Sequence, residues 1–525
     1  VYSQMRLHED TTRSVYQALA SRATTLVNEY LTSVAYLTPE ILAIAETQLN
    51  DWVAAEPALA VYRHELDDIV RGRPHVLSAE MEGLLARASE LGDAPEHIYE
   101  MLDYADLKLP LVHDEQGQEA QLTQGNYVSR FLESRDRAVR REAFEAMLGV
   151  YQGFQNTIGA TLAAHVKRDL FFARARHYDT ALEASLAPHN IPTSVYDTLV
   201  TTVNQNLPPL QRYLRLRQRM LGLDELHMYD LYVPMVAEVE YKVSFEQARE
   251  TVASALAPLG ERYVAGLREG FSHRWIDVYE NEGKRSGAYS GGCFSTHPFV
   301  LLNYQKSLDN VYTLAHEMGH SMHSYFTWRT QPYVYGGYTI FLAEVASTLN
   351  ESLLTHYLLE RTTDRALRLY IINQYLETFR TTLYRQTLFA EFERDIHTRA
   401  EAGEALTPDL LSTIYKALCD RYYGASVVVD DLIAIEWARI PHFYSTYYVY
   451  QYATGISASA ALAQRIIIEG QPAVDRYLRF LSRGSSDYSI NLLRDAGVDM
   501  SNPAPVQQAL DTFGRYLDEM ERLVG

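Results

Sequence analysis

The sequence is poor in cysteine, in basic charge and in long apolar runs, and each shortage argues against a class of protein. Only Cys293 and Cys419 occur in 525 residues, which argues against a disulfide framework and favours a cytoplasmic location. Acidic residues outnumber Lys and Arg by 67 to 47, so the formal net charge is −20 and nucleic acid is not expected as a partner. No apolar run approaches the roughly 20 residues of a membrane span, so no membrane partner is expected. No signal peptide is visible, although the chain starts at Val1 rather than Met.

Strand patterns are scarce as well, and most of the chain carries the 3.6-residue periodicity of helices. The predicted helices cover approximately residues 9–36, 57–71, 78–91, 134–176, 194–221, 243–269, 338–360, 364–401, 408–422, 443–468 and 472–483. Residues 109–112 and 120–122 flank a turn and predict a hairpin, and 275–279 and 299–304 predict single strands. The sequence therefore predicts a mainly α fold with a small β-sheet. Polar, turn-forming residues at 113–124 predict a boundary between two domains, 1–120 and 121–525.

The sequence H-E-M-G-H at 316–320 carries the clearest chemistry. Residues four apart lie on one face of a helix, so His316 and His320 can bind one metal ion, with Glu317 between them as general base. Glu344 lies 24 positions after His320, far enough for a loop and a second helix, and can supply a third ligand. Three protein ligands and a position open to water form the pattern of a catalytic zinc site, so we predict one Zn²⁺ per chain. The alternative is a pair of ordinary histidines on a helix surface.

Two further residues near the motif, His323 and Glu351, each have two possible roles. His323 points almost the same way as the predicted ligands but lies about 10 Å from His316 along the helix. Zinc–nitrogen bonds are about 2 Å long, so one ion cannot bind all three histidines, and we assign His323 to packing or to support of a ligand. Glu351 lies two turns after Glu344. It either orients a ligand histidine or is a solvated carboxylate on the helix surface.

The predicted strand 299–304 and the glycine-rich stretch 287–292 precede the metal-binding helix, which Ser307 or Asp309 can cap. The strand is either an exposed edge that pairs with an extended peptide over the metal or an internal strand of the sheet. The glycines form either a close approach of the backbone to substrate or a mobile turn.

A second candidate group follows Pro441. It comprises His442 and the tyrosines Tyr444, Tyr447, Tyr448, Tyr450 and Tyr452. On a helix, the first, third and fifth of these tyrosines would share one face, and the second and fourth another. A phenol can donate a hydrogen bond to an oxyanion without carrying charge. The alternative is an aromatic stripe packed between helices, with a structural histidine beside it.

Together these segments resemble oligoendopeptidase F, of the thimet oligopeptidase-like zinc metallopeptidase family. The resemblance rests on residues 284–289, 296–299, 316–320, 340–351 and 440–455, and the segments 73–80 and 484–488 extend it over nearly the whole chain. It implies that His316, His320 and Glu344 bind zinc and that Glu317 is the base. It also implies that His442 and nearby tyrosines stabilise the transition state. The spacing differs from that of the thimet branch, and we choose Tyr447 and Tyr450, with Tyr448 in reserve.

The resemblance further implies a zincin-like helical fold closed around a deep channel, which would admit short peptides and exclude folded proteins. Family members usually begin upstream, so we expect the helical domain 1–120 to be truncated at its start and 121–525 to be catalytic. The predicted function is that of a zinc-dependent oligoendopeptidase, in which Glu317 accepts a proton from the water that attacks an internal peptide bond. The alternatives are a zinc exopeptidase of the carboxypeptidase kind, a non-catalytic peptide binder and a structural metal protein.

Overall fold

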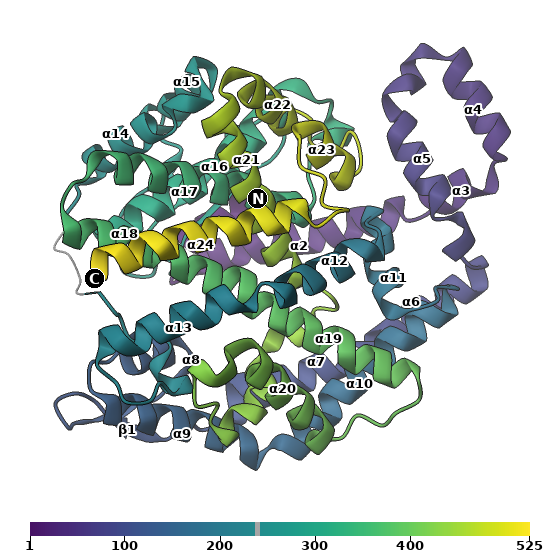
Figure 1. The fold of residues 1–525 in the computed structure, drawn as a ribbon. Helices are drawn as coiled ribbons and strands as arrows, with labels where there is room; N and C mark the ends of the chain where they lie inside the picture. Colours follow the sequence, from purple (N-terminus) through teal and green to yellow (C-terminus); the bar gives the residue numbers. More distant parts are fainter. Residues whose placement is uncertain (237–241) are drawn as a thin grey trace. The chain divides into compact units, whose positions relative to one another are not determined.

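The computed structural model describes residues 1–236 and 242–525, most of which lie in helices (Figure 1). The chain forms two compact units, each assembled from three separate stretches of sequence. Unit 1 comprises residues 1–79, 240–361 and 455–500, and unit 2 comprises residues 80–239, 362–454 and 501–525. The structure therefore agrees with the predicted mainly α fold, whereas the domains 1–120 and 121–525 stay a prediction. Among the described residues, no helix is both long and apolar enough to cross a lipid bilayer.

Unit 1 consists of helices and one small sheet. Its helices are α1 (Tyr2–Glu9), α2 (Ser14–Val34), α3 (Leu37–Ala43), α4 (Glu46–Ala55), α5 (Arg63–Arg71), α14 (Phe245–Ala255), α15 (Glu261–Ser272), α16 (Leu308–Thr330), α17 (Ile340–Arg361), α22 (Gln471–Leu481) and α23 (Ser489–Ala496). Its strands are β3 (Ile276–Asp277), β4 (Tyr289–Gly291) and β5 (Phe299–Leu301). Within this unit, α16 and α17 make the most extensive contact of any two described elements (Figure 1).

Unit 2 is a helical assembly with one hairpin. Its helices are α6 (Ala79–Gly92), α7 (Ala94–Glu100), α8 (Gln124–Asn126), α9 (Arg137–Gly153), α10 (Gln155–Ala175), α11 (Ala181–Leu186), α12 (Thr193–Gln205), α13 (Leu207–Leu221), α18 (Arg365–Phe379), α19 (Arg385–Glu401), α20 (Pro408–Tyr423) and α24 (Ala504–Val524). Helix α21 (Tyr450–Glu469) begins in unit 2 and continues in unit 1. Strands β1 (Leu111–His113) and β2 (Glu119–Gln121) pair antiparallel, which confirms the predicted hairpin.

The sheet of unit 1 decides between the two interpretations of the strand before the metal-binding helix. Its strand order is β3-β5-β4, with β5 parallel to β3 and antiparallel to β4. Val300 of β5 therefore pairs with Ile276 on one side and with Ser290 on the other. The strand is internal, and the edge interpretation of 299–304 is wrong. The outer strand β4 lies in the glycine-rich stretch, where low β propensity concealed it.

Several long predicted helices are interrupted in the structure. The predicted helix 194–221 divides between α12 and α13 because Pro208 and Pro209 lack the amides that would continue it, and prolines are well suited to a first helical turn. The predicted helix 243–269 divides at Pro258 and Gly260 for a similar reason. The predicted helix 9–36 begins only at residue 14, and 134–176 divides at residue 154, whereas 364–401 continues without a break through a π-helical turn at 380–384.

The predicted helix 443–468 is wrong at its start, which matters for the candidate site. Residues Pro441–Tyr444 form a 3₁₀ turn, η12, and the α-helix begins only at Tyr450. Tyr447 has a φ of 53°, in the left-handed region that an α-helix cannot include. The tyrosines of this segment therefore do not line two faces of one helix.

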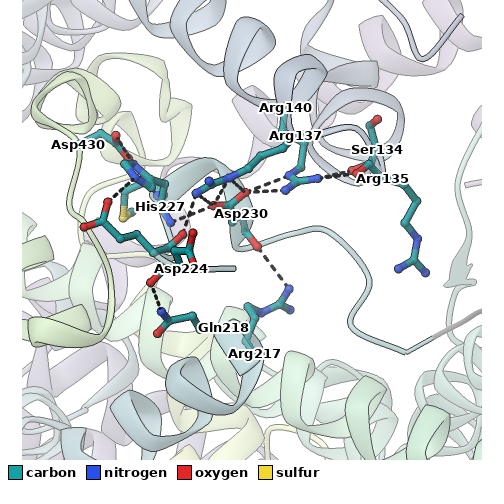
Figure 2. Close-up of polar contacts among 12 residues, drawn as sticks. Ser134, Arg135, Arg137, Arg140, Arg217, Gln218, Asp224, His227, Asp230 and Asp430 are labelled. Carbon is teal, nitrogen blue, oxygen red and sulfur yellow. Dashed lines mark hydrogen bonds and ion pairs between the residues drawn. The ribbon is translucent and has the colours of Figure 1, made fainter. Parts of the chain in front are cut away.

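A buried ionic group anchors part of unit 2 (Figure 2). Asp230 is fully buried and accepts hydrogen bonds from Arg140, at 2.6 Å, and from Arg137, at 2.9 Å, both on α9. Its second oxygen also accepts the backbone N–H of His227 at 3.0 Å. The imidazole of His227 in turn lies 2.8 Å from Asp430. A buried carboxylate of this kind is tolerated only because both of its oxygens are paired.

Substitution Asp230→Ala would leave the Arg137 and Arg140 guanidinium groups without their shared carboxylate. We expect it to lower the free energy of unfolding by about 3–5 kcal/mol, the usual cost of breaking a buried ion pair. Urea denaturation followed by circular dichroism measures the loss. Asp224→Ala is the control, because Asp224 is exposed and, among the described residues, only its backbone oxygen accepts a bond, from Gln218. An equal loss in both variants would contradict the ionic explanation.

Candidate metal centre

The two helices that carry the predicted metal ligands are well defined at their ends. Ser307, one of the two predicted caps, caps α16: its hydroxyl oxygen accepts the backbone N–H of Asn310 at 3.2 Å. The helix buries an apolar face that includes Val311, Leu314, Met318 and Met322. After a connection at 331–339, α17 begins at Ile340. The structure thus confirms the loop and second helix expected between His320 and Glu344.

Helices α16 and α17 come into close contact at Gly319. This glycine lies between the two motif histidines in the sequence and faces α17. A Cβ added at Gly319 would lie 2.6 Å from Cα of Ser347 and 2.7 Å from the carbonyl oxygen of Ala346. These are backbone atoms, so no change of rotamer could relieve the overlap. The absence of a side chain at this position lets the backbones of the two helices touch within one residue of His320.

The close approach brings together the three predicted ligands. One nitrogen each from His316 and His320 and one oxygen of Glu344 lie within 4.8 Å of one another. The two Nε2 atoms are 3.2 Å apart, and Oε2 of Glu344 lies 3.4 Å from the first and 3.8 Å from the second. All three side chains are partly exposed, which leaves an approach from solvent. No other group of this kind occurs among the described residues.

Helix α17 also supplies a supporting partner for each ligand. Glu351 accepts a hydrogen bond from Nδ1 of His316, so the other ring nitrogen faces the cluster. The backbone carbonyl of Ala343 accepts from His320. The hydroxyl of Ser347 donates to Oε2 of Glu344 at 3.0 Å. Contacts of this kind fix the ring orientation and basicity of metal ligands. The geometry thus favours the ligand-orienting interpretation of Glu351 over that of a solvated carboxylate.

A buried amide ties the two helices to a third. Nδ2 of Asn350 on α17 donates to the backbone carbonyl of Ala315 on α16 at 2.9 Å. Its Oδ1 accepts from the hydroxyl of Tyr263 on α15, also at 2.9 Å. Asn350 is fully buried, and the two bonds satisfy both ends of its side chain. The separation of α16 and α17 is therefore held by polar contacts as well as by apolar packing.

Glu317 lies beside the cluster with the properties of a base. It is buried, and its Oε2 has no hydrogen-bond partner among the described residues. Burial raises the pKa of Glu317 to about 7, an effect that the charge of His316 opposes and the charges of Glu344 and Glu351 strengthen. The backbone N–H of Ser290, on the outer strand β4, donates to the carboxylate. A carboxylate whose pKa is near neutrality can both accept and release a proton.

His323 does not join the cluster. It is buried, and its ring stacks on that of Tyr338 with centroids 3.8 Å apart and planes 6° apart. The Tyr338 hydroxyl lies 2.9 Å from that of Ser324. Burial lowers the pKa of His323 to about 3, and the charge of His320 adds to this effect. Its role is packing beneath the ligands, one of the two roles predicted for it.

The candidate oxyanion donors belong to unit 2, whereas the metal cluster belongs to unit 1. Tyr447 and Tyr450 are buried, and their rings pack on Tyr196 with centroids 5.5 Å and 5.1 Å away. His442 is exposed and Tyr448 is half-buried, and these two rings are nearly parallel, 6.3 Å apart. The choice of Tyr447 and Tyr450 as donors stays a prediction that their burial disfavours.

Several residues of the metal centre were not identified from the sequence. They are Ser290, Gly319, Ser347 and Asn350. No local signal selects them, because Ser347 and Asn350 stand among other polar residues of α17. Ser290 acts through its backbone amide and Gly319 through its missing side chain, and no local pattern reveals either role.

Two family models match the sequence. The model described as peptidase family M3 matches residues 130–512, and the model described as Oligopeptidase F matches residues 40–108. The chain is 50% identical over 523 residues to oligopeptidase PepF of Bacillus subtilis, an alignment that spans 100% of this chain and 78% of the relative. It is 45% identical over 524 residues to group B oligopeptidase PepB of Streptococcus agalactiae, spanning 100% and 87%.

Solved structures show the same fold. The crystal structure of oligoendopeptidase-F from Enterococcus faecium superposes with a TM-score of 0.80 at 42% identity, covering 100% of this chain and 89% of that chain. A crystal structure from Chlamydophila abortus superposes with a TM-score of 0.93 at 36% identity, covering 99% and 87%.

Substitution Gly319→Ala tests whether the close approach of the helices holds the cluster together. The added methyl group must separate α16 from α17, so we expect the dissociation constant for Zn²⁺ to rise at least tenfold, as for other changes outside the ligands themselves. Competition with a chromophoric chelator measures it. Gly149→Ala on α9 is the control, because an added Cβ there would meet no described atom within 4 Å. Unchanged affinity in Gly319→Ala would show that the backbone contact does not set the ligand geometry.

Proposed function

Because the chain belongs to peptidase family M3, we propose that it is a zinc-dependent oligoendopeptidase that hydrolyses internal bonds of short peptides. One observation carries the finer part of this proposal. A cluster of two imidazoles and one carboxylate lies beside a buried carboxylate, Glu317, that has an oxygen without a partner. In this proposal all catalytic residues fall in the region 121–525.

The donor set fits zinc. Two imidazole nitrogens and one carboxylate oxygen are the ligands of a common class of catalytic zinc site, which leaves a coordination position for water or substrate. The supporting bonds from Glu351, Ala343 and Ser347 already orient each ligand. Bound zinc would supply a Lewis acid and would lower the pKa of a coordinated water towards neutrality.

The chain's own residues supply the proton transfers. Glu317 accepts the proton of the attacking water and then gives it to the amine of the departing product, so no net proton is consumed. The buried position of Glu317 suits both steps because its pKa lies near 7. The Ser290 amide holds the carboxylate in place, so β4 orients the base as well as forming the outer strand of the sheet.

We assign the donors for the developing oxyanion to His442 and Tyr448. Both are accessible in unit 2, and their rings lie side by side. The hydroxyl of Tyr452 donates to that of Tyr448 at 3.4 Å, which orients the second phenol. Gly455 follows these tyrosines closely in sequence and packs in unit 1 against Glu344, where an added Cβ would lie 3.2 Å from Cβ of the ligand.

The proposed substrates are short peptides in the cytoplasm, with no part for nucleic acid or membrane. An exopeptidase remains the second candidate because it could use the same zinc chemistry. An endopeptidase acts at internal bonds and does not need a free terminus. A peptide blocked by N-acetylation and C-terminal amidation therefore separates the two activities.

The test incubates the zinc-loaded protein with peptides of about eight to fifteen residues, in one end-blocked and one unblocked mixture, and identifies the products by mass spectrometry. We expect internal cleavage by the wild-type chain. Glu317→Gln should keep zinc and fold but lose most of its turnover, because it removes the proton acceptor and no ligand. His316→Ala and Glu344→Ala should instead lose the metal. Cleavage of unblocked peptides alone would support the exopeptidase. Normal turnover by Glu317→Gln would show that Glu317 is not the base.

Phenylalanine variants distinguish the tyrosines. Tyr448→Phe should lower kcat by about 10²–10³-fold with little change in KM, because an oxyanion donor acts on charge that develops in the transition state. Tyr447→Phe and Tyr450→Phe keep the rings that pack on Tyr196, so we expect losses of a few-fold at most. Steady-state kinetics on one blocked peptide measures all three variants. A large kcat loss in Tyr447→Phe or Tyr450→Phe would restore the prediction made from the sequence.

A further inference from the structure

Four ionisable side chains lie buried together in unit 2, against the segment 441–452 that holds the proposed oxyanion donors. Glu393 and His397 are one turn apart on α19, and His165 and Asp169 are one turn apart on α10. The proposed mechanism gives none of them a role. Burial of ionisable groups is costly unless they are paired, so four of them in one place need a physical explanation.

Three of these side chains, Asp169, His165 and His397, form a network that also reaches the backbone of Glu393. Oδ2 of Asp169 lies 3.1 Å from Nε2 of His397 and 3.5 Å from Nε2 of His165. Nδ1 of His397 lies 2.8 Å from the backbone carbonyl of Glu393. The carboxylate between the two imidazoles therefore joins α10 to α19 and fixes the turn of α19 from which Glu393 projects.

Glu393 reaches out of this network to the backbone of the candidate segment. Its carboxyl group accepts the backbone N–H of Tyr447, the residue whose φ of 53° lies in the left-handed region. A tyrosine is disfavoured there because its Cβ crowds the backbone, so the bond stabilises a conformation that the residue itself disfavours. The Tyr447 ring packs between His397, at 4.7 Å, and Tyr196. The other oxygen of Glu393 is buried without a partner among the described residues.

The preceding residue is held by the same network. The hydroxyl of Thr446 lies 3.3 Å from Nε2 of His165 and also hydrogen-bonds Asp169. Its backbone carbonyl accepts from the hydroxyl of Ser185 at 3.1 Å. Tyr447 is buried and Thr446 is half-buried, and both are held by these contacts, whereas His442 earlier in the segment is exposed and the next residue, Tyr448, is half-buried.

We propose that Glu393 is a positioning residue that holds the left-handed turn at Tyr447 and thereby sets His442 and Tyr448 side by side. Asp169, His165 and His397 keep Glu393 in place. The left-handed φ of Tyr447 sets the direction in which the backbone continues, so the direction of the next side chain depends on that conformation being kept. The catalytic part of this inference rests on the proposed function, but the structural part does not.

The test compares two substitutions at position 393. Glu393→Gln keeps an oxygen that can accept the Tyr447 amide, whereas Glu393→Met has a similar length and no acceptor. We expect Glu393→Met to lose at least tenfold in kcat on a blocked peptide, with KM and zinc content unchanged, and Glu393→Gln to stay within threefold of the wild type. Thr446→Val is a milder change to the same network and should lower kcat by about threefold. It replaces Glu393→Met in the test if that variant does not fold.

A matched control lies on the same helix. Glu391 is also a buried carboxylate, but it binds Asn204, Tyr422 and Arg421 and does not reach the segment 441–452. We expect Glu391→Met to lower the thermal unfolding midpoint without changing kcat. If Glu391→Met lost as much kcat as Glu393→Met, general destabilisation would explain both losses, and the proposal would be overturned.

Amide hydrogen exchange provides a readout that does not depend on activity. In Glu393→Met, exchange should become faster in peptides that cover 441–452 and stay unchanged in those that cover α16 and α17. Unchanged exchange in 441–452 would overturn the structural part of the proposal. Faster exchange with unchanged kcat would overturn the catalytic part, and a wild-type chain that cleaves no peptide would count against the proposed function instead.

Discussion

The contact between α16 and α17 at Gly319 is the constraint on which the metal centre depends. Packed helices ordinarily lie about 8–10 Å apart, a distance set by the side chains between them. Here the backbone of one helix touches that of the other beside His320. The side chain of Glu344 is therefore long enough to reach both histidines on the neighbouring helix. The bond from Asn350 to the Ala315 carbonyl holds the same separation one turn away. The ligand geometry follows from how near two helices can come.

The parts of the site that depend on one helix alone could be predicted from the sequence. His316 and His320 face the same way because they are four residues apart, and Glu317 lies between them for the same reason. The registry of one helix against another is not contained in such a pattern. The sequence therefore left two interpretations open for Glu351, whose role depends on which residue of α16 it meets, and it gave no reason to select Ser347 or Gly319.

Two of the errors have a common physical origin in contacts with another segment of the chain. The helix predicted to begin at 443 fails because the backbone turns at Tyr447, and the acceptor that stabilises the turn, Glu393, lies 54 positions away. The glycine-rich strand β4 exists because β5 offers it backbone partners, not because its residues favour extended structure. Propensity and periodicity describe what a segment prefers alone, and in both places a partner segment overrides that preference.

The arrangement of the ligands within the chain has a consequence for the order of folding. His316, His320 and Glu344, with their supporting partners, all come from α16, α17 and the short connection 331–339. Closing so short a loop costs little entropy, and contacts that are local in sequence form quickly. The metal centre can thus assemble from one helical pair before the three separate stretches of unit 1 have come together. An ion captured at that stage would stabilise the pair by a free energy that grows with the logarithm of its free concentration, so that metal supply would affect the yield of folded chain as well as its turnover.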